Sequence, residues 1–125
     1  MQYVAVAIGA MLGANARFLI GNWAAERFGA EFPYGTLVNN VSGAFVIGVF
    51  LSFVGERVGI NPLWRLFFAT GFLGGYTTFS SYAWETLVLA QGGQWIPALL
   101  YVVGSNVIGF FGVWLGASLA RLAPL

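Results

Sequence analysis

Residues 71–82 (GFLGGYTTFSSY) place small and hydroxyl side chains in the middle of a long apolar segment. Three glycines occur within five residues, and Thr77, Thr78 and Ser80 follow them. Glycine weakens a helix interior, and threonine and serine compete for backbone hydrogen bonds. A helix break at membrane depth survives only where protein buries it or where it lines a polar cavity. The stretch therefore predicts ion or substrate handling, the alternative being a glycine-rich packing face on an unbroken helix.

The remaining chemistry-bearing residue types are few. The sequence has no cysteine and no histidine, which excludes thiol nucleophiles, disulfides, zinc–thiolate sites and the usual general base. Because no nucleophile–base pair is visible, we expect no enzymatic activity. The chain has no basic cluster and a net charge of only +1, so we expect no nucleic-acid partner.

The composition indicates an integral membrane protein in a lipid bilayer. Of the 125 residues, 59% are hydrophobic and 7% are charged, against about 25% charged in a soluble domain. We expect one membrane domain over residues 1–125, with an all-α fold of four transmembrane helices. The first helix lacks a charged leader and a cleavage site, so we interpret it as a retained span. The four spans are approximately 3–25, 36–54, 63–90 with a break near 73–78, and 96–119.

Local signals support these spans. Gly9 and Gly13 form a GxxxG pair, which predicts close packing of the first span against a neighbouring helix. Asn61 and Pro62 are expected to be the N-cap and first residue of the third span. Glu85 is the one acid inside a span, and we expect it to be solvated at the helix end or paired with an arginine.

Arginines are distributed unequally between the two sides of the membrane. The side with both termini receives Arg57, Arg65 and Arg121, and the other receives Arg27 and, if it lies near that surface, Arg17. Orientation follows this difference, which is small here and comes without any lysine. A chain that inserts in both orientations could form an antiparallel homodimer whose two breaks cross at the midplane. The alternative is one orientation, with the three-arginine side inside.

Three stretches resemble the signatures of a known family. Residues 13–18 (GANARF), 33–43 (PYGTLVNNVSG) and 71–82 are similar, in order and spacing, to those of the Fluc fluoride channels, also called CrcB proteins. The resemblance covers essentially the whole chain. It implies a dual-topology homodimer in the plasma membrane (the inner membrane of a cell with two). It also implies two parallel pathways for passive fluoride export and a structural sodium ion at the dimer centre.

The same resemblance suggests residue roles. The family's pore asparagine matches Asn40, and its two pore phenylalanines match Phe79 and, with a tyrosine instead, Tyr82. Ser105 and Tyr101 match a polar pair on the last helix, and backbone carbonyls matching Gly74 and Thr77 would hold the sodium. The predicted fluoride pathway also includes Thr36, which shares a helix face with Asn40, together with Thr78 and Arg17. Gly109 stands where some members have serine, which reduces the number of polar groups on the last helix.

Physical chemistry allows these roles and also simpler ones. Asn40 offers two N–H donors for a dehydrated anion, or it bonds neighbouring helices together. Phe79 and Tyr82 lie three apart on one helix face, where positive ring edges could stabilise an anion without trapping it; otherwise they are lipid-facing or core. Gly74 and Gly75 are expected to let the chain turn so that carbonyls point inward, or they form a water-filled kink. Arg17 either snorkels or attracts anions in a vestibule.

Other classes of function fit less well. A small dual-topology multidrug or cation transporter also has four spans, but it needs a carboxylate deep in the first one, where this chain has Arg17. A membrane scaffold would have no use for a broken helix. The sequence therefore predicts a fluoride channel.

Overall fold

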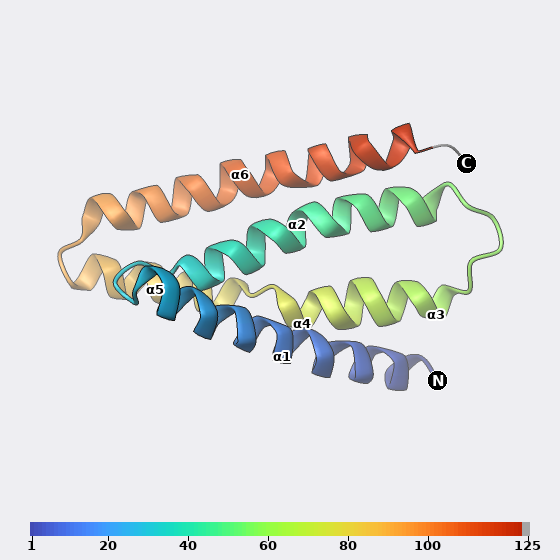
Figure 1. Ribbon diagram of the computed structural model, residues 1–125, viewed down its shortest axis with the longest axis horizontal. Coiled ribbons are helices and arrows are strands. Elements are labelled where there is room, and N and C mark those ends of the chain that lie inside the picture. The colour runs from blue at the N-terminus through green and yellow to red at the C-terminus, as the bar shows by residue number, and fades with distance from the viewer. Residues whose placement is uncertain (124–125) are drawn as a thin grey trace.

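The computed structural model describes residues 1–123, and nearly all of them are helical. The elements are α1 (Gln2–Phe28), α2 (Tyr34–Gly55), α3 (Pro62–Arg65), η1 (Leu66–Leu73), α4 (Gly74–Tyr76), α5 (Phe79–Gln91) and α6 (Trp95–Leu122). In Figure 1 they form an elongated bundle, with α6 and α2 on one side and α1 beside the α3–α4 segment on the other. The N-terminus and the end of α6 lie at the same end of the bundle.

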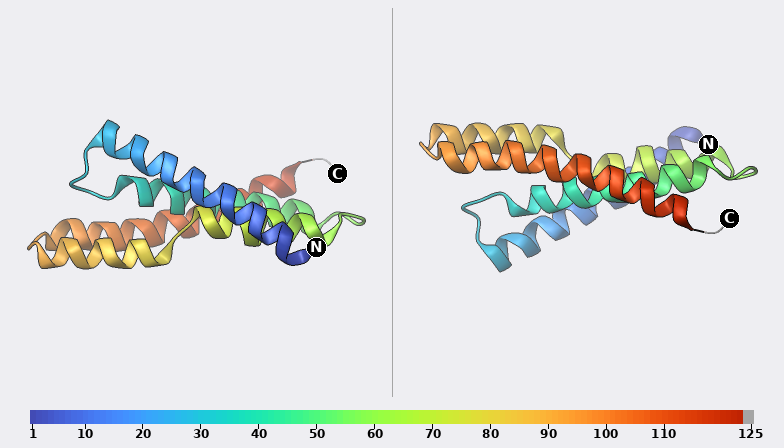
Figure 2. Two further views of the ribbon diagram at one scale, coloured as in Figure 1. Left: turned by 90° about the horizontal axis from the view of Figure 1, so that it is seen from below. Right: turned by 90° about the horizontal axis from the view of Figure 1, so that it is seen from above.

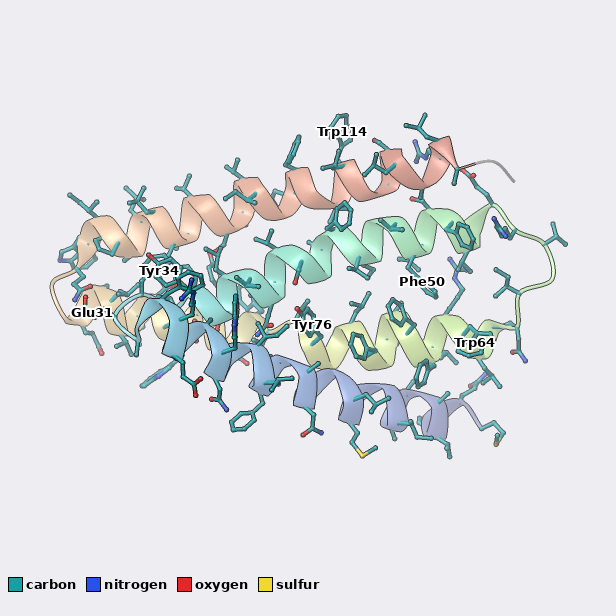
Figure 3. The ribbon with its side chains drawn as sticks, in the orientation of Figure 1. Glu31, Tyr34, Phe50, Trp64, Tyr76 and Trp114 are labelled. Carbon is teal, nitrogen blue, oxygen red and sulfur yellow. The ribbon has the colours of Figure 1, made fainter. Side chains whose placement is uncertain are left out.

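Among residues 1–123, three helices are long and apolar enough to cross a membrane: α1, α2 and α6. Two tryptophans of α6 are spaced as expected for the two borders of a membrane. Trp95 and Trp114 lie about 28 Å apart at 1.5 Å per residue. This separation is close to the hydrocarbon core of a bilayer, about 30 Å, at whose borders tryptophan is enriched. Trp114 points away from the other helices, as expected for a side chain in contact with lipid (Figure 3).

Local capping fixes the helix ends. Asn61 accepts a hydrogen bond from the Leu63 N–H (3.0 Å) ahead of Pro62, which confirms the predicted start of α3. Gly29 and Gly93 adopt positive φ (87° and 78°) in the turns after α1 and before α6, where a side chain would be strained. The helices therefore begin and end within a few residues of the expected spans.

Glycines hold the two helix pairs together. A Cβ atom on Gly13 would lie 1.9 Å from the Phe72 carbonyl oxygen, and one on Gly48 would lie 2.3 Å from that of Val113. Such contacts are possible only without a side chain, so α1 packs directly on η1 and α2 packs directly on α6. This confirms the predicted packing face of the first span. Figure 2 shows these two pairs crossing near the middle of the molecule.

The segment η1 is a π-helix of eight residues, which hydropathy did not predict. Phe68 and Phe72 of η1 and Tyr76 of α4 follow one another as a stack, with ring centroids 5.4 and 5.8 Å apart. The stack ends where the Tyr76 hydroxyl lies 2.9 Å from Ser42 Oγ, which bonds this segment to α2 in the centre of the molecule (Figure 3). π-Helical turns are rare and often occur next to functional sites.

Candidate functional site

The backbone leaves the helical conformation between α4 and α5. Thr77 (φ −88°, ψ 157°) and Thr78 (φ −153°, ψ 115°) are extended, and Figure 1 shows them as a short link in the middle of the bundle. Thr78 is also the N-cap of α5, since its hydroxyl accepts a bond from the Ser81 N–H (3.2 Å). The backbone changes direction at these two threonines, which lie within the predicted range 73–78.

The glycines before the link have a different role from the one expected. Gly74 is an α-helical residue (φ −62°), and neither it nor Gly75 has positive φ. The expectation that they form the turn is therefore wrong. Gly75 instead allows close approach to α1, because a Cβ atom there would lie 2.6 Å from the Ala10 carbonyl oxygen. Gly74 is exposed, and a Cβ atom there would meet no atom closer than 3.9 Å.

Asn40 of α2 bonds to the backbone of the link. Its Oδ1 accepts from the Thr78 N–H (2.7 Å), and its Nδ2 donates to the Thr78 carbonyl (3.0 Å). The side chain thus replaces the helical partners that Thr78 has lost, which is how a break can exist without unsatisfied backbone groups. Within residues 1–123, one of the two Nδ2 hydrogens has no acceptor and remains for another group.

An open pocket of about 510 Å³ lies beside this pairing. Phe79, the first residue of α5, borders the pocket and is 79% exposed. The structure therefore brings the predicted residues of α2, α4, the link and α5 together around one space. The lining residues are Asn40, Gly43, Ala44, Ile47, Ala69, Leu73, Gly74, Thr77, Thr78, Phe79, Phe110 and Val113.

A series of aromatic rings continues from Phe79. The ring centroid of Tyr82 lies 5.6 Å from that of Phe79 and 5.1 Å from that of Tyr101, to which it is nearly perpendicular (68°). Phe32, before α2, lies edge-on to Tyr101 at 5.4 Å. The two edge-to-face contacts of Tyr101 present positive ring edges, and the predicted aromatic residues form one connected set.

Glu85 connects three helices. Thr36 of α2 donates to its Oε1 (2.7 Å), and Tyr101 of α6 donates to its Oε2 (2.6 Å). Our expectation of an arginine partner or helix-end solvation is therefore wrong. The available signal was its spacing, because Glu85 lies three residues after Tyr82 and so on the same face of α5. In this arrangement the hydroxyl hydrogens of Thr36 and Tyr101 are used by the carboxylate.

Ser105 lies one helical turn after Tyr101. Its Oγ is buried and has no hydrogen-bond partner within residues 1–123. A buried hydroxyl without a partner is costly and indicates a group that is satisfied in another state or by another molecule. Ser105 is therefore available to a ligand, whereas Thr36 and Tyr101 are already bonded.

Arg17 lies on the other side of the link. Its Nε donates to the Gly75 carbonyl (3.0 Å), at the C-terminal end of α4, where carbonyls lack helical partners. Asn39, which is 2% exposed, donates to the Arg17 carbonyl (3.3 Å). The lining of the 510 Å³ pocket contains no residue of α1 in the described part of the chain. The structure thus separates Arg17 from Asn40 and Phe79.

The predicted sodium ligands are compatible with a hard cation, which prefers oxygen. Gly74 and Thr77 both line the open pocket. The Thr78 N–H donates to Asn40 and not to the Gly74 carbonyl, which a continuous helix would have engaged. Two carbonyl groups are too few for a complete coordination shell, so this chain would supply only part of it.

Comparison with known proteins places the chain in a family. A family model described as "CrcB-like protein, Camphor Resistance (CrcB)" matches residues 4–117. The chain belongs to the CrcB-like family. Its family membership and its three apolar helices show that the chain is a multi-pass membrane protein.

Similar proteins from several bacteria carry one name. A protein of Roseiflexus sp. (strain RS-1) named "Fluoride-specific ion channel FluC" is 48% identical over 99% of the CrcB-like chain and 100% of its own length. Proteins of the same name from Solibacter usitatus (49% identical; 97% and 99% covered) and Acidobacterium capsulatum (48%; 93% and 93%) are equally similar. The likeness covers the whole site.

Proposed function

We propose that this chain is a fluoride-selective channel of the plasma membrane, through which fluoride leaves the cytoplasm passively. The observation that carries the proposal is the combination of Asn40 and Phe79 around one pocket at the link, in a chain whose full-length relatives are named fluoride channels. No carboxylate lines that pocket. Its polar groups are neutral, so they can replace water around a small anion without trapping it.

The pathway that we propose begins beside the link and continues toward the α1–α2 end of the molecule. It includes Asn40, Thr78, Phe79 and Tyr82, then Ser105, Tyr101 and Thr36. The support is that Asn40 bonds to Thr78 and that the rings from Phe79 through Tyr82 to Tyr101 lie in contact. Tyr101 and Thr36 then share Glu85, and Ser105 lies one helical turn after Tyr101. Arg17 would attract fluoride toward the entrance, because its terminal nitrogens make no hydrogen bond within residues 1–123.

We further propose that two copies assemble as an antiparallel homodimer with two pathways. In each chain α3, η1, α4 and α5 would together form the third of four spans, broken at Thr77 and Thr78. The Gly74 carbonyl, which the Thr78 N–H does not engage, would be unfavourable in lipid and favourable against a second copy. A sodium ion held by the Gly74 and Thr77 carbonyls of both copies would join the two links.

The cation-transporter alternative is weaker. Such a carrier needs an exchangeable carboxylate deep in the first span, where α1 has Arg17. Glu85 is a poor substitute, since both of its oxygens accept hydroxyl hydrogen bonds.

A liposome efflux assay tests the function. Vesicles that contain the protein and internal potassium fluoride should release fluoride when valinomycin lets potassium leave as the counter-ion. Matched vesicles with internal potassium chloride should retain chloride. Equal release of the two anions, or release of neither, would contradict the proposal.

A further inference from the structure

Asn106 is a polar side chain near the middle of α6. It lies 11 residues after Trp95 and 8 before Trp114, which places it about 16 Å and 12 Å from the two tryptophans at 1.5 Å per residue. A primary amide at such a depth is costly unless its hydrogen bonds are made. Asn106 is exposed on the single chain, so these hydrogen bonds decide whether its amide can bind an anion.

The amide hydrogens of Asn106 are both used. Nδ2 donates to the Val102 carbonyl of its own helix (2.8 Å) and to the Tyr82 hydroxyl oxygen on α5 (3.1 Å). An asparagine amide has two hydrogens, so none remains for an anion. Asn106 is therefore unsuited to bind fluoride directly, in contrast to Asn40, which keeps one hydrogen free.

The bond from Asn106 determines which part of the Tyr82 hydroxyl remains unbonded. Its oxygen accepts from Asn106, and its hydrogen has no acceptor within residues 1–123. The ring itself is held between Phe79 and Tyr101, at centroid distances of 5.6 and 5.1 Å. The phenol is thus fixed at both its ring and its oxygen, with one O–H donor to spare.

We propose that Asn106 is a positioning residue that holds the Tyr82 phenol, so that the Tyr82 hydroxyl donates a hydrogen bond to the permeating anion. This inference rests on the proposed function and adds a specific donor to it. Accepting a hydrogen bond polarises a hydroxyl and strengthens its own donation. A neutral O–H group next to a ring edge favours the strongest hydrogen-bond acceptor among small anions, which is fluoride, over chloride.

A double-mutant cycle in proteoliposomes tests the proposal. Asn106→Leu keeps the side-chain size and removes the amide, and Tyr82→Phe keeps the ring and removes the hydroxyl. Each should slow fluoride efflux by about threefold to tenfold, the loss of roughly one hydrogen bond, and raise the half-saturating fluoride concentration. The double variant should be no slower than the slower single variant, because both remove the same donor.

Asn15→Leu is the matched control. Asn15 is an exposed asparagine of α1 whose Nδ2 bonds only to its own helix, at the Met11 carbonyl (2.7 Å). Its replacement should leave efflux and half-saturation unchanged. Multiplicative losses in the double variant, or normal half-saturation in both single variants, would overturn the proposal.

Melting temperatures of the same four proteins in detergent separate this inference from the proposed function. The shifts for Tyr82→Phe and Asn106→Leu should be non-additive if the side chains are bonded, whether or not the protein conducts fluoride. Additive shifts would overturn the positioning role. A wild type that releases no fluoride but shows non-additive shifts would overturn the proposed function and the donor role, and would leave the bond itself established.

Discussion

Asn40 combines a structural bond with an unused donor, and an aspartate at this position would affect both. The carboxylate cannot donate to the Thr78 carbonyl, and it places negative charge beside the proposed anion pathway. We expect Asn40→Asp to reduce fluoride efflux by more than about tenfold, corresponding to at least 1.4 kcal/mol. The measurement is efflux from liposomes, with the amount of folded protein determined by size-exclusion chromatography.

Asn15→Asp is the control for this change, because it adds the same charge to an exposed position of α1. It should leave efflux nearly unchanged. Normal efflux through Asn40→Asp would show that Asn40 takes no part in conduction. Loss of all folded protein would show that its bond to Thr78 is its main role.

Phe79 allows a cleaner separation of function from stability. Because its side chain is 79% exposed on the single chain, its replacement should cost little folding energy. Phe79→Ile keeps apolar bulk and removes the positive ring edge, so we expect efflux to fall about tenfold with little change in melting temperature. Phe18→Ile, at a 70% exposed position of α1, is the control and should conduct normally. Equal efflux from both variants would argue against an aromatic anion site.

Sequence reasoning at this scale succeeded where the family resemblance supplied the residues and was less successful elsewhere. It placed Asn40, Thr78 and Phe79 in one site, and the structure brings them together. It did not find that Glu85 bonds to Thr36 and Tyr101, because the three residues lie on three different helices and the face that Glu85 shares with Tyr82 does not identify these partners. It also assigned Gly74 and Gly75 to a turn, whereas glycine can equally serve close helix approach, and composition does not distinguish the two uses.

At the scale of elements, the contact of α1 with η1 depends on glycine. Alanine at Gly13 would place its Cβ 1.9 Å from the Phe72 carbonyl oxygen, which the backbone must move to avoid. We expect Gly13→Ala to destabilise the protein by about 1–3 kcal/mol, as overpacked sites do. Gly21→Ala, in the same helix, adds a Cβ atom that meets no atom within 4 Å, and should instead be neutral or stabilising by up to about 1 kcal/mol. Melting temperatures in detergent check both, and equal shifts would refute the packing argument.

Helix positions were predictable because apolar length and capping residues determine them, as with Asn61 and Pro62 before α3. The π-helix Leu66–Leu73 was not predictable, because a change from i→i+4 to i→i+5 bonding leaves hydropathy unchanged. Its aromatic stack, ending at Tyr76, joins the segment before the link to α2. Such a connection would transmit a displacement of the link to the helix that carries Asn40.

At the scale of the whole molecule, two features bear on the proposed antiparallel dimer. The open pocket would face the second copy, and the weak arginine bias would allow chains to insert in both orientations. The antiparallel arrangement requires that half of the chains insert in each orientation. The chain has no cysteine, so single cysteines report orientation without further changes. Val58→Cys, at a fully exposed position in the loop between α2 and α3, and Glu31→Cys, exposed between α1 and α2, mark opposite ends of the bundle (Figures 1 and 3).

A membrane-impermeant maleimide added to intact cells should label about half of each variant, and labelling should become complete after permeabilisation, since the small arginine difference barely favours either orientation. If all chains share one orientation, one variant is labelled fully and the other not at all, and an antiparallel dimer is impossible.

Adding two arginines to the α2–α3 loop provides the internal check. The positive-inside rule then predicts that Val58→Cys becomes protected and Glu31→Cys becomes accessible. Fluoride efflux from cells expressing only that biased chain should fall, because partners of opposite orientation would be missing.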